Sequence, residues 1–250
     1  MSKDNSFPLR ALEMPSLSGK CNRIFDESIS PYDRIRTMSD TEFEDLTAAW
    51  VLKVKNYANV CTVGGSKDAG RDIVAYYASP TDKIDIYQCK HCNKPLSPAI
   101  YCVEFGKLCY YTWKGTYRVP EKYYIVGSNG IGDSLRTLIE HPERINAYLT
   151  SNWDKYCRKK NKITSDGVKL DNDLKEYIQS FDFTIVDEVS PQTLIKEMES
   201  SKLYKYFFGG GLKTRPFVPK PANEMGENDS PSESAPPADF SDIYDRFRTM

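Results

Sequence analysis

The sequence predicts a mixed α/β fold in which a small mixed central sheet is flanked by helices. The first observation is a run of apolar residues at helical spacing through residues 43–57. The second is a series of β-prone segments interrupted by turn-forming residues and by one longer apolar segment. These segments predict three strands, a helix and a further strand, at residues 60–63, 71–78, 84–91, 97–114 and 123–126.

The N-terminal part of the chain is expected to hold an irregular segment followed by one strong helix. Residues 1–32 are expected to be irregular, because Pro8, Pro15 and Pro31 interrupt any period. The first strong helix is expected to start at Thr41, which can cap it, with Glu44 three residues later completing a capping box.

Helices are expected to dominate the second half of the chain. Residues 133–157 are expected to be helical, with a break at His141-Pro142. A helix–strand–helix unit is then expected at residues 170–179, 181–186 and 191–206. Four regions result: an irregular segment, a core, its helix–strand–helix extension, and a disordered Pro/Ser/Glu-rich tail with a short docking motif at Phe240–Phe247. Their bounds are 1–32, 33–160, 161–212 and 213–250.

The composition limits the setting more than the function. The chain has 34 Lys+Arg against 35 Asp+Glu, a formal net charge of −1, which neither supports nor excludes nucleic acid as a partner. The N-terminus lacks the pattern of a secretory signal, and no window approaches the roughly 18 apolar residues that span a bilayer. We therefore expect a cytoplasmic protein with no membrane partner. Its seven cysteines, an odd number, are expected to be reduced thiols.

Two neighbouring predicted strands carry the residue types that phosphodiester hydrolysis needs. Asp72 stands at the start of one strand, and Gln88 and Lys90 lie two residues apart on the next, hence on the same face. Carboxylate and amide oxygens can hold Mg²⁺ or Mn²⁺, which neutralises charge and activates water. Lys90 could orient that water. Glu44, on the preceding helix, is a candidate fourth member that holds a water at the metal.

The glycine-rich segment before Asp72 completes a recognisable pattern. Gly64 and Gly65 leave room for a close phosphate, and Asp68 lies in the same loop. The segment Gly64–Ile73, followed by Tyr87-Gln88-Cys89-Lys90-His91, resembles the core of the PD-(D/E)XK restriction-endonuclease-like family, particularly its Mrr-like branch. The resemblance covers roughly Asp40 to Lys94. It implies a restriction-endonuclease-like fold, with Asp72 as metal ligand, Gln88 in a usually acidic position and Lys90 as the catalytic lysine.

A weaker resemblance covers the rest of the chain. The Tyr-Tyr-Ile-Val strand, Asn152-Trp153 and Phe207–Gly210 before a Pro-rich stretch resemble nuclease effectors of bacterial anti-phage defence. These include effectors of cyclic-oligonucleotide signalling systems and nuclease subunits of Lamassu-type systems. This implies double-stranded DNA as substrate and regulatory partners such as an ABC-type ATPase or a sensor protein. A homo-oligomer is expected on separate grounds, because a duplex has two strands and one metal site of this type cuts one of them. Such effectors usually continue into a sensor or assembly domain, so separate partners or a longer parent protein are expected.

Two alternatives to a defence nuclease stay open. One is an Mrr-like type IV restriction enzyme that recognises modified DNA. The other is a catalytically silent module that binds DNA or a protein.

Other motifs favour structural interpretations. Cys89 and Cys92, with His91, Cys102 and Cys109, suggest zinc. Only one pair has the short spacing of a usual zinc site, so buried thiols are expected. The basic run 158–162 is interpreted as a solvated helix end in preference to a phosphate contact. The aromatic cluster in and after the helix 97–114 is expected in the core or at a subunit interface: Tyr110, Tyr111, Trp113 and Tyr117.

Overall fold

The computed structural model describes residues 9–11, 29–63, 69–77 and 83–209. Contacts divide the chain into two units, Met1–Gly211 and Leu212–Met250, and every described residue belongs to the first. The predicted loop residues Gly64, Gly65 and Asp68 lie outside the described residues, as do the predicted tail and its docking motif at 240–247.

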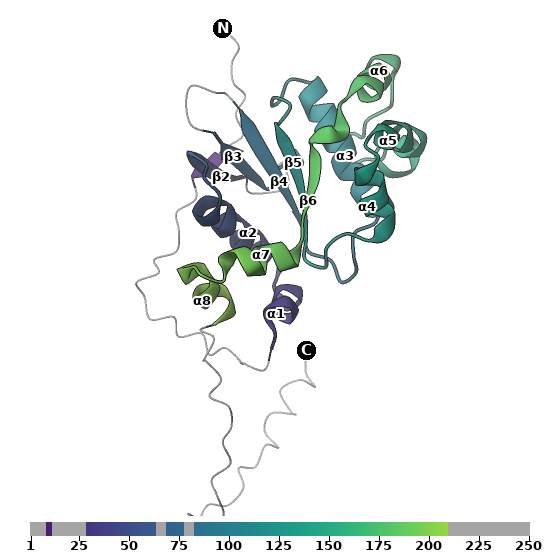
Figure 1. Cartoon of the computed structure of the whole chain (residues 1–250). Coiled ribbons are helices and arrows are strands. Elements are labelled where there is room, and N and C mark those ends of the chain that lie inside the picture. The colour runs from purple at the N-terminus through teal and green to yellow at the C-terminus, as the bar shows by residue number, and fades with distance from the viewer. Residues whose placement is uncertain (1–8, 12–28, 64–68, 78–82, 210–250) are drawn as a thin grey trace, which may run out of the picture. The chain divides into compact units, whose positions relative to one another are not determined.

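A mixed six-stranded sheet forms the centre of the first unit (Figure 1). Its strands lie side by side in chain order: β1 (Leu9–Ala11), β2 (Asn59–Val63), β3 (Ile73–Tyr76), β4 (Ile84–Lys90), β5 (Lys122–Gly127) and β6 (Val186–Val189). Strands β1 to β4 pair antiparallel, whereas β4, β5 and β6 run parallel. Before β5 and again before β6, helices carry the chain back to the end of the sheet at which the preceding strand started. The next strand therefore runs in the same direction and pairs parallel.

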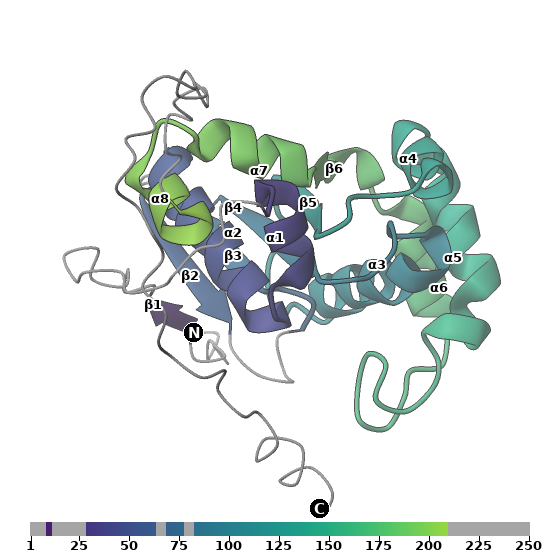
Figure 2. The ribbon, with the colours of Figure 1, turned by 90° about the horizontal axis from the view of Figure 1, so that it is seen from below.

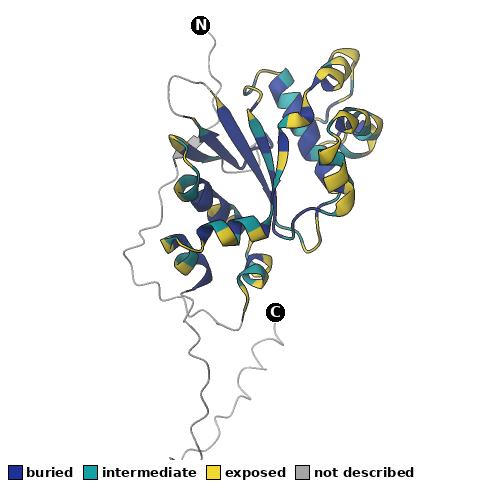
Figure 3. Ribbon diagram, viewed as in Figure 1, coloured by how far each residue is buried: buried dark blue, intermediate teal, exposed yellow. Residues whose placement is uncertain are grey.

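Helices cover both faces of this sheet, which gives three layers (Figures 1 and 2). One face carries α3 (Pro98–Trp113), α4 (Asp133–Glu140), α5 (Glu143–Tyr156) and α6 (Asn172–Ser180). The other carries α1 (Pro31–Thr37), α2 (Asp40–Val54), α7 (Pro191–Met198) and α8 (Lys202–Phe208). Figure 3 shows the buried strands between helices with exposed outer faces. None of the helices in the described ranges has the length and apolar character to cross a membrane.

Strand β4 is buried on both faces. Its side chains point alternately to the two faces of the sheet, and this alternation decides where the candidate site lies. Ile84 and Ile86 belong to the core cluster on the α3 face, whereas Tyr87 and Cys89 belong to the cluster on the α2 face. Because successive side chains point to opposite faces, Gln88 lies on the α3 face with Ile86.

The N-terminal region differs from the prediction. Leu9–Ala11 forms an edge strand paired with β2, and Pro31 opens α1 instead of interrupting structure, since proline suits the first helical turn. Helix α2 is capped by Ser39, whose hydroxyl accepts from the Glu42 N–H while the Glu42 carboxylate accepts from the Ser39 N–H. The predicted cap at Thr41 was therefore two residues late: the same S/T-x-x-E pattern occurs twice, and the first one forms the box.

The C-terminal part also differs in detail. The break predicted at His141-Pro142 is confirmed, because α4 ends at Glu140 and α5 starts at Glu143. The strand predicted at 181–186 is wrong: a short 3₁₀ helix, η1 (Phe183–Ile185), stands there and β6 follows it. The helix predicted at 191–206 is two helices, α7 and α8, separated by a turn in which the Ser201 N–H donates to the Met198 carbonyl.

Candidate functional site

Asp72 and Gln88 are hydrogen-bonded to each other at the start of β3. Asp72 directly precedes β3, and its Oδ2 accepts a hydrogen bond from Gln88 Nε2 at 2.7 Å. The same oxygen accepts from the backbone N–H of Cys89 at 2.6 Å. Both side chains are buried. The structure therefore brings together the carboxylate and the amide that the sequence singles out.

The side-chain amide oxygen of Gln88, Oε1, is the most unusual feature of this pair. Its Oε1 is buried and has no hydrogen-bond partner among the described residues. The orientation of the amide is fixed by Asp72, because a carboxylate accepts hydrogen bonds and the Nε2 group is the one that donates. A buried acceptor left unpaired costs about 1–3 kcal/mol. Gln88 Oε1 is therefore an oxygen that a ligand would satisfy.

Lys90 is held by an acidic residue from helix α3. Its Nζ lies 2.9 Å from Oε1 of Glu104, and Lys107 Nζ lies 3.1 Å from the other carboxylate oxygen. The Glu104 side chain is 6% exposed, against 28% for Lys90 and 17% for Lys107. Glu104, which lies on α3, thus sits between two lysines.

The two lysines decide the charge state of Glu104. Burial alone would raise the pKa of this carboxyl, but the charges of Lys90 and Lys107 and their hydrogen bonds outweigh burial and lower the pKa below its ordinary value. Glu104 is therefore an anion at neutral pH, and two cations face one carboxylate.

The side chain of Tyr101 also links the two carboxylates. Burial raises the pKa of this fully buried phenol well above its usual range, and the negative charges of Glu104 and Asp72 raise it further. The charges of both carboxylates are therefore felt at one side chain of α3.

The chain enters the site through a strained and tightly packed loop. Ala69 and Gly70 both have positive φ angles, 56° and 78°. A Cβ on Gly70 would stand 3.0 Å from Lys107 Cβ, so glycine allows the loop to lie directly on α3. Tyr117 anchors the loop from the other side, because its hydroxyl donates to the Ala69 carbonyl at 3.2 Å and its ring stacks 4.4 Å from the Arg71 guanidinium.

The donor atoms suit Mg²⁺ better than a softer metal. Asp72 and Glu104 supply carboxylates and Gln88 supplies its unpaired amide oxygen. Mg²⁺ prefers oxygen ligands and commonly takes one or two carboxylates with waters and substrate oxygens. Within the described ranges, no group of three or more His, Cys, Asp or Glu side chains is arranged to hold a metal ion. The donor types of Asp72, Gln88 and Glu104 are those that would suit a Mg²⁺ ion, and the metal itself stays a prediction.

Glu44 approaches the strand pair from the opposite face. It is half-buried on α2, and its charge contributes to the raised pKa of the Cys89 thiol, after burial and the charge of Asp72. Cys89 belongs to the α2-face core, whereas Gln88 and Lys90 lie on the α3 face. The role predicted for Glu44 at the metal stays a prediction.

Three of the cysteines considered above as zinc ligands lie in two different core clusters. Cys89 is buried in the α2-face core, while Cys102 and Cys109 are buried in the α3-face core. The sheet separates these thiols.

Glu104 and Lys107 are the site residues that sequence reasoning missed. A signal was present: they are the two charged residues of α3, whose other residues from Pro98 to Trp113 are apolar or uncharged polar. A charged pair three positions apart in a helix this apolar indicates a specific buried partner.

No family model matches the chain, and no curated protein and no solved structure matches it either.

Proposed function

We propose that this protein is a Mg²⁺-dependent endonuclease of the PD-(D/E)XK type that hydrolyses phosphodiester bonds of double-stranded DNA. The observation that carries the proposal is the unpaired, buried Oε1 of Gln88, on a side chain bonded to Asp72 and two residues from Lys90. The element order α2, β2, β3, β4, α3, β5 supports it, because the resemblance implies a mixed sheet built in this way.

Each residue has a defined part in this mechanism. Asp72 and Gln88 would hold the metal, with Glu104 as a further oxygen donor. A bound Mg²⁺ supplies positive charge at the scissile phosphate and lowers the pKa of water. Lys90 orients the attacking water and stabilises charge that develops on the phosphate oxygens.

Lys107 makes the release of Lys90 possible. Both lysines share the Glu104 carboxylate, at 2.9 and 3.1 Å. When Lys90 turns to a substrate phosphate, Lys107 still neutralises Glu104, so no buried carboxylate is left alone. Lys107 is in this sense a positioning residue.

The two lysines around Glu104 also favour one alternative function, that of a catalytically silent binding module. A closed set of ion pairs can stabilise a fold without chemistry, which would suit a silent module that binds DNA or a protein. A silent module has no use, however, for the unpaired oxygen of Gln88.

Control of the activity belongs to the same proposal. A non-specific DNA nuclease that was always active would destroy the DNA of its own cell. We therefore propose that its activity depends on oligomerisation or on release from a partner, as expected for the anti-phage effectors that the chain resembles.

Supercoiled plasmid, incubated with MgCl₂, MnCl₂ or EDTA over a range of protein concentrations, tests the proposal. Cutting is expected with either metal and not with EDTA, and Asp72→Asn is expected to abolish it. Asp187→Asn, an exposed carboxylate on β6, is the matched control and should cut like the parent. Cutting that persists in EDTA, or that survives in Asp72→Asn, would disprove the metal mechanism.

A further inference from the structure

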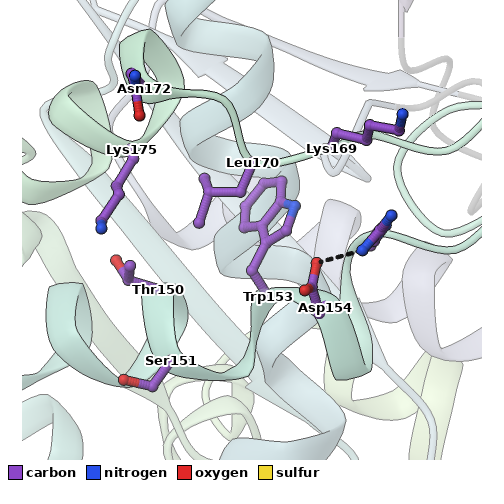
Figure 4. A pocket seen from close by; sticks show the side chains of 9 residues that line it. Thr150, Ser151, Trp153, Asp154, Lys169, Leu170, Asn172 and Lys175 are labelled. Carbon is purple, nitrogen blue, oxygen red and sulfur yellow. Dashed lines mark ion pairs between the residues drawn. The ribbon is translucent and has the colours of Figure 1, made fainter.

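A cleft of about 430 Å³ lies between α5 and the segment that leads into α6 (Figure 4). Trp153 and Leu170 form its apolar part. Thr150 and Ser151 contribute hydroxyls from α5, and Asn172 contributes an amide from α6. The cleft is therefore lined by hydrogen-bonding groups around a small apolar base.

The charges around this cleft are predominantly positive. Arg158, Lys169 and Lys175 line it, and Asp154 is its one acidic residue. Asp154 is already paired with Arg158 at 3.4 Å. The cleft thus has two more cations than anions (three against one), in a chain whose formal net charge is −1. Excess positive charge beside hydroxyl and amide donors is the chemistry that recognises phosphate groups.

Two of the three cations, Arg158 and Lys169, are carried on a tightly packed loop. Gly167 has a φ angle of 80°, and a Cβ there would lie 2.4 Å from the carbonyl oxygen of Arg158. The backbone at Gly167 therefore lies directly against the backbone at Arg158. The Val168 N–H donates to that carbonyl at 3.1 Å, and the Val168 carbonyl accepts from Trp153 Nε1 at 2.9 Å. The backbone at Arg158 and next to Lys169 is therefore fixed beside the cleft before any ligand binds, which lowers the entropic cost of ordering this loop on binding.

The same loop packs on the helix that carries Glu104. Cys157, just before Arg158, donates its Sγ–H to the Cys102 carbonyl at 3.5 Å, and a Cβ on Gly106 would lie 2.8 Å from that sulfur. Residues 102 and 106 share one face of α3, and Glu104 points to the opposite face. The start of the loop thus lies on the side of α3 opposite to Glu104.

We propose that the α5–α6 cleft, defined by Arg158, Lys169 and Lys175 with their polar neighbours, binds the phosphate backbone of the DNA duplex that is cut at Asp72 and Lys90. The choice of DNA as ligand rests on the proposed function. A membrane surface fits less well, because the large exposed apolar residues of the described chain, Ile29, Tyr77, Ile100 and Val119, do not line the cleft. Arg158, the first residue of the basic run after α5, therefore has a binding role beyond that of a solvated helix end.

Fluorescence anisotropy with a labelled duplex, measured in EDTA across a series of salt concentrations, tests this proposal. The variant is Lys169→Ala/Lys175→Ala, two exposed residues outside the candidate site. Affinity should fall about tenfold or more at 0.1 M salt, and the slope of log K against log salt should become shallower by about 1.8, which is about 0.9 for each phosphate that the variant no longer neutralises. The matched control is Lys196→Ala/Lys202→Ala, two exposed lysines on α7 and α8 on the other face of the sheet.

The outcomes separate this inference from the proposed function. If the cleft variant binds DNA with the affinity and salt slope of the parent, the cleft proposal is overturned, even if Lys90→Ala abolishes cutting. If the variant loses binding as expected while the parent cuts no DNA with any metal, the cleft proposal stands and the nuclease proposal fails. Displacement of the duplex by millimolar inorganic phosphate, or tighter binding to phosphatidylserine vesicles than to DNA, would also overturn it. Circular dichroism should show unchanged folding.

Discussion

Replacing Glu104 by glutamine removes the one negative charge between Lys90 and Lys107 while keeping the size of the side chain. Breaking a buried ion pair and leaving a charge uncompensated costs about 3–5 kcal/mol. The carboxylate is 6% exposed but the lysines are 28% and 17% exposed, so partial solvation of the lysines places the loss at the lower end, about 3 kcal/mol. For a chain of this length that corresponds to a fall in Tm of about 6–12 °C.

Urea unfolding of four proteins measures this effect: the parent, Glu104→Gln, Lys107→Met and the double variant. Because the double variant removes one charge of each sign, its loss should fall short of the sum of the single losses by more than about 1 kcal/mol. A loss below about 1 kcal/mol for Glu104→Gln is typical of an exposed pair and would refute the burial argument.

The pH dependence of that loss has a definite sign. The pKa of Glu104 is lowered in the folded protein, so its contribution to stability is present above the ordinary value of 4.5 and is lost as the pH falls through the lowered folded pKa. The difference in unfolding free energy between parent and Glu104→Gln should therefore be constant near neutral pH and shrink only in acid. A difference that shrinks with rising pH would contradict this assignment.

Three further predictions concern other parts of the chain. Gln88→Glu places a second carboxylate 2.7 Å from Asp72, so the variant should melt lower than the parent in EDTA and gain more Tm from Mg²⁺ in differential scanning calorimetry. Tyr57→Phe removes one of two tyrosine hydroxyls that donate to the buried Asp85 carboxylate, and urea unfolding should show a loss of about 1.5–3 kcal/mol. Deleting residues 214–250 should change sedimentation and the concentration dependence of plasmid cutting more than Tm; a lower Tm with unchanged assembly would contradict it.

The order of the elements follows from local sequence, which is why it could be predicted. The apolar period through Phe43 and Trp50, the β-prone run 84–91 and the apolar segment 97–114 each specify their element independently of the rest of the chain. The boundaries were less accessible. Ser39 and Thr41 both start an S/T-x-x-E pattern, and the choice between them depends on how α2 packs on the sheet. Leu9–Ala11 is a strand because it finds β2, about fifty residues away, which no local pattern reveals.

In the candidate site, too, the residues placed by local sequence could be predicted and the residue placed by tertiary packing could not. Gln88 and Lys90 share a face because strand alternation has a period of two, and Asp72 contacts Gln88 because β3 and β4 are neighbours. Glu104 joins them only through the packing of α3 against the sheet, which is a tertiary contact. The charge of Glu104 in an apolar helix was visible in the sequence, but its partner was not.

The single-turnover rate of plasmid cutting by Lys90→Ala in MgCl₂ measures whether Lys90 acts in DNA hydrolysis. The fold should survive, because Glu104 keeps its ion pair with Lys107. We expect the rate to fall about 10²–10³-fold at unchanged DNA affinity, as for the loss of one group that stabilises developing charge. Lys83→Ala, which removes an exposed lysine paired with Glu121, is the control and should cut like the parent. A Lys90→Ala protein that cuts within about tenfold of the parent would contradict the account.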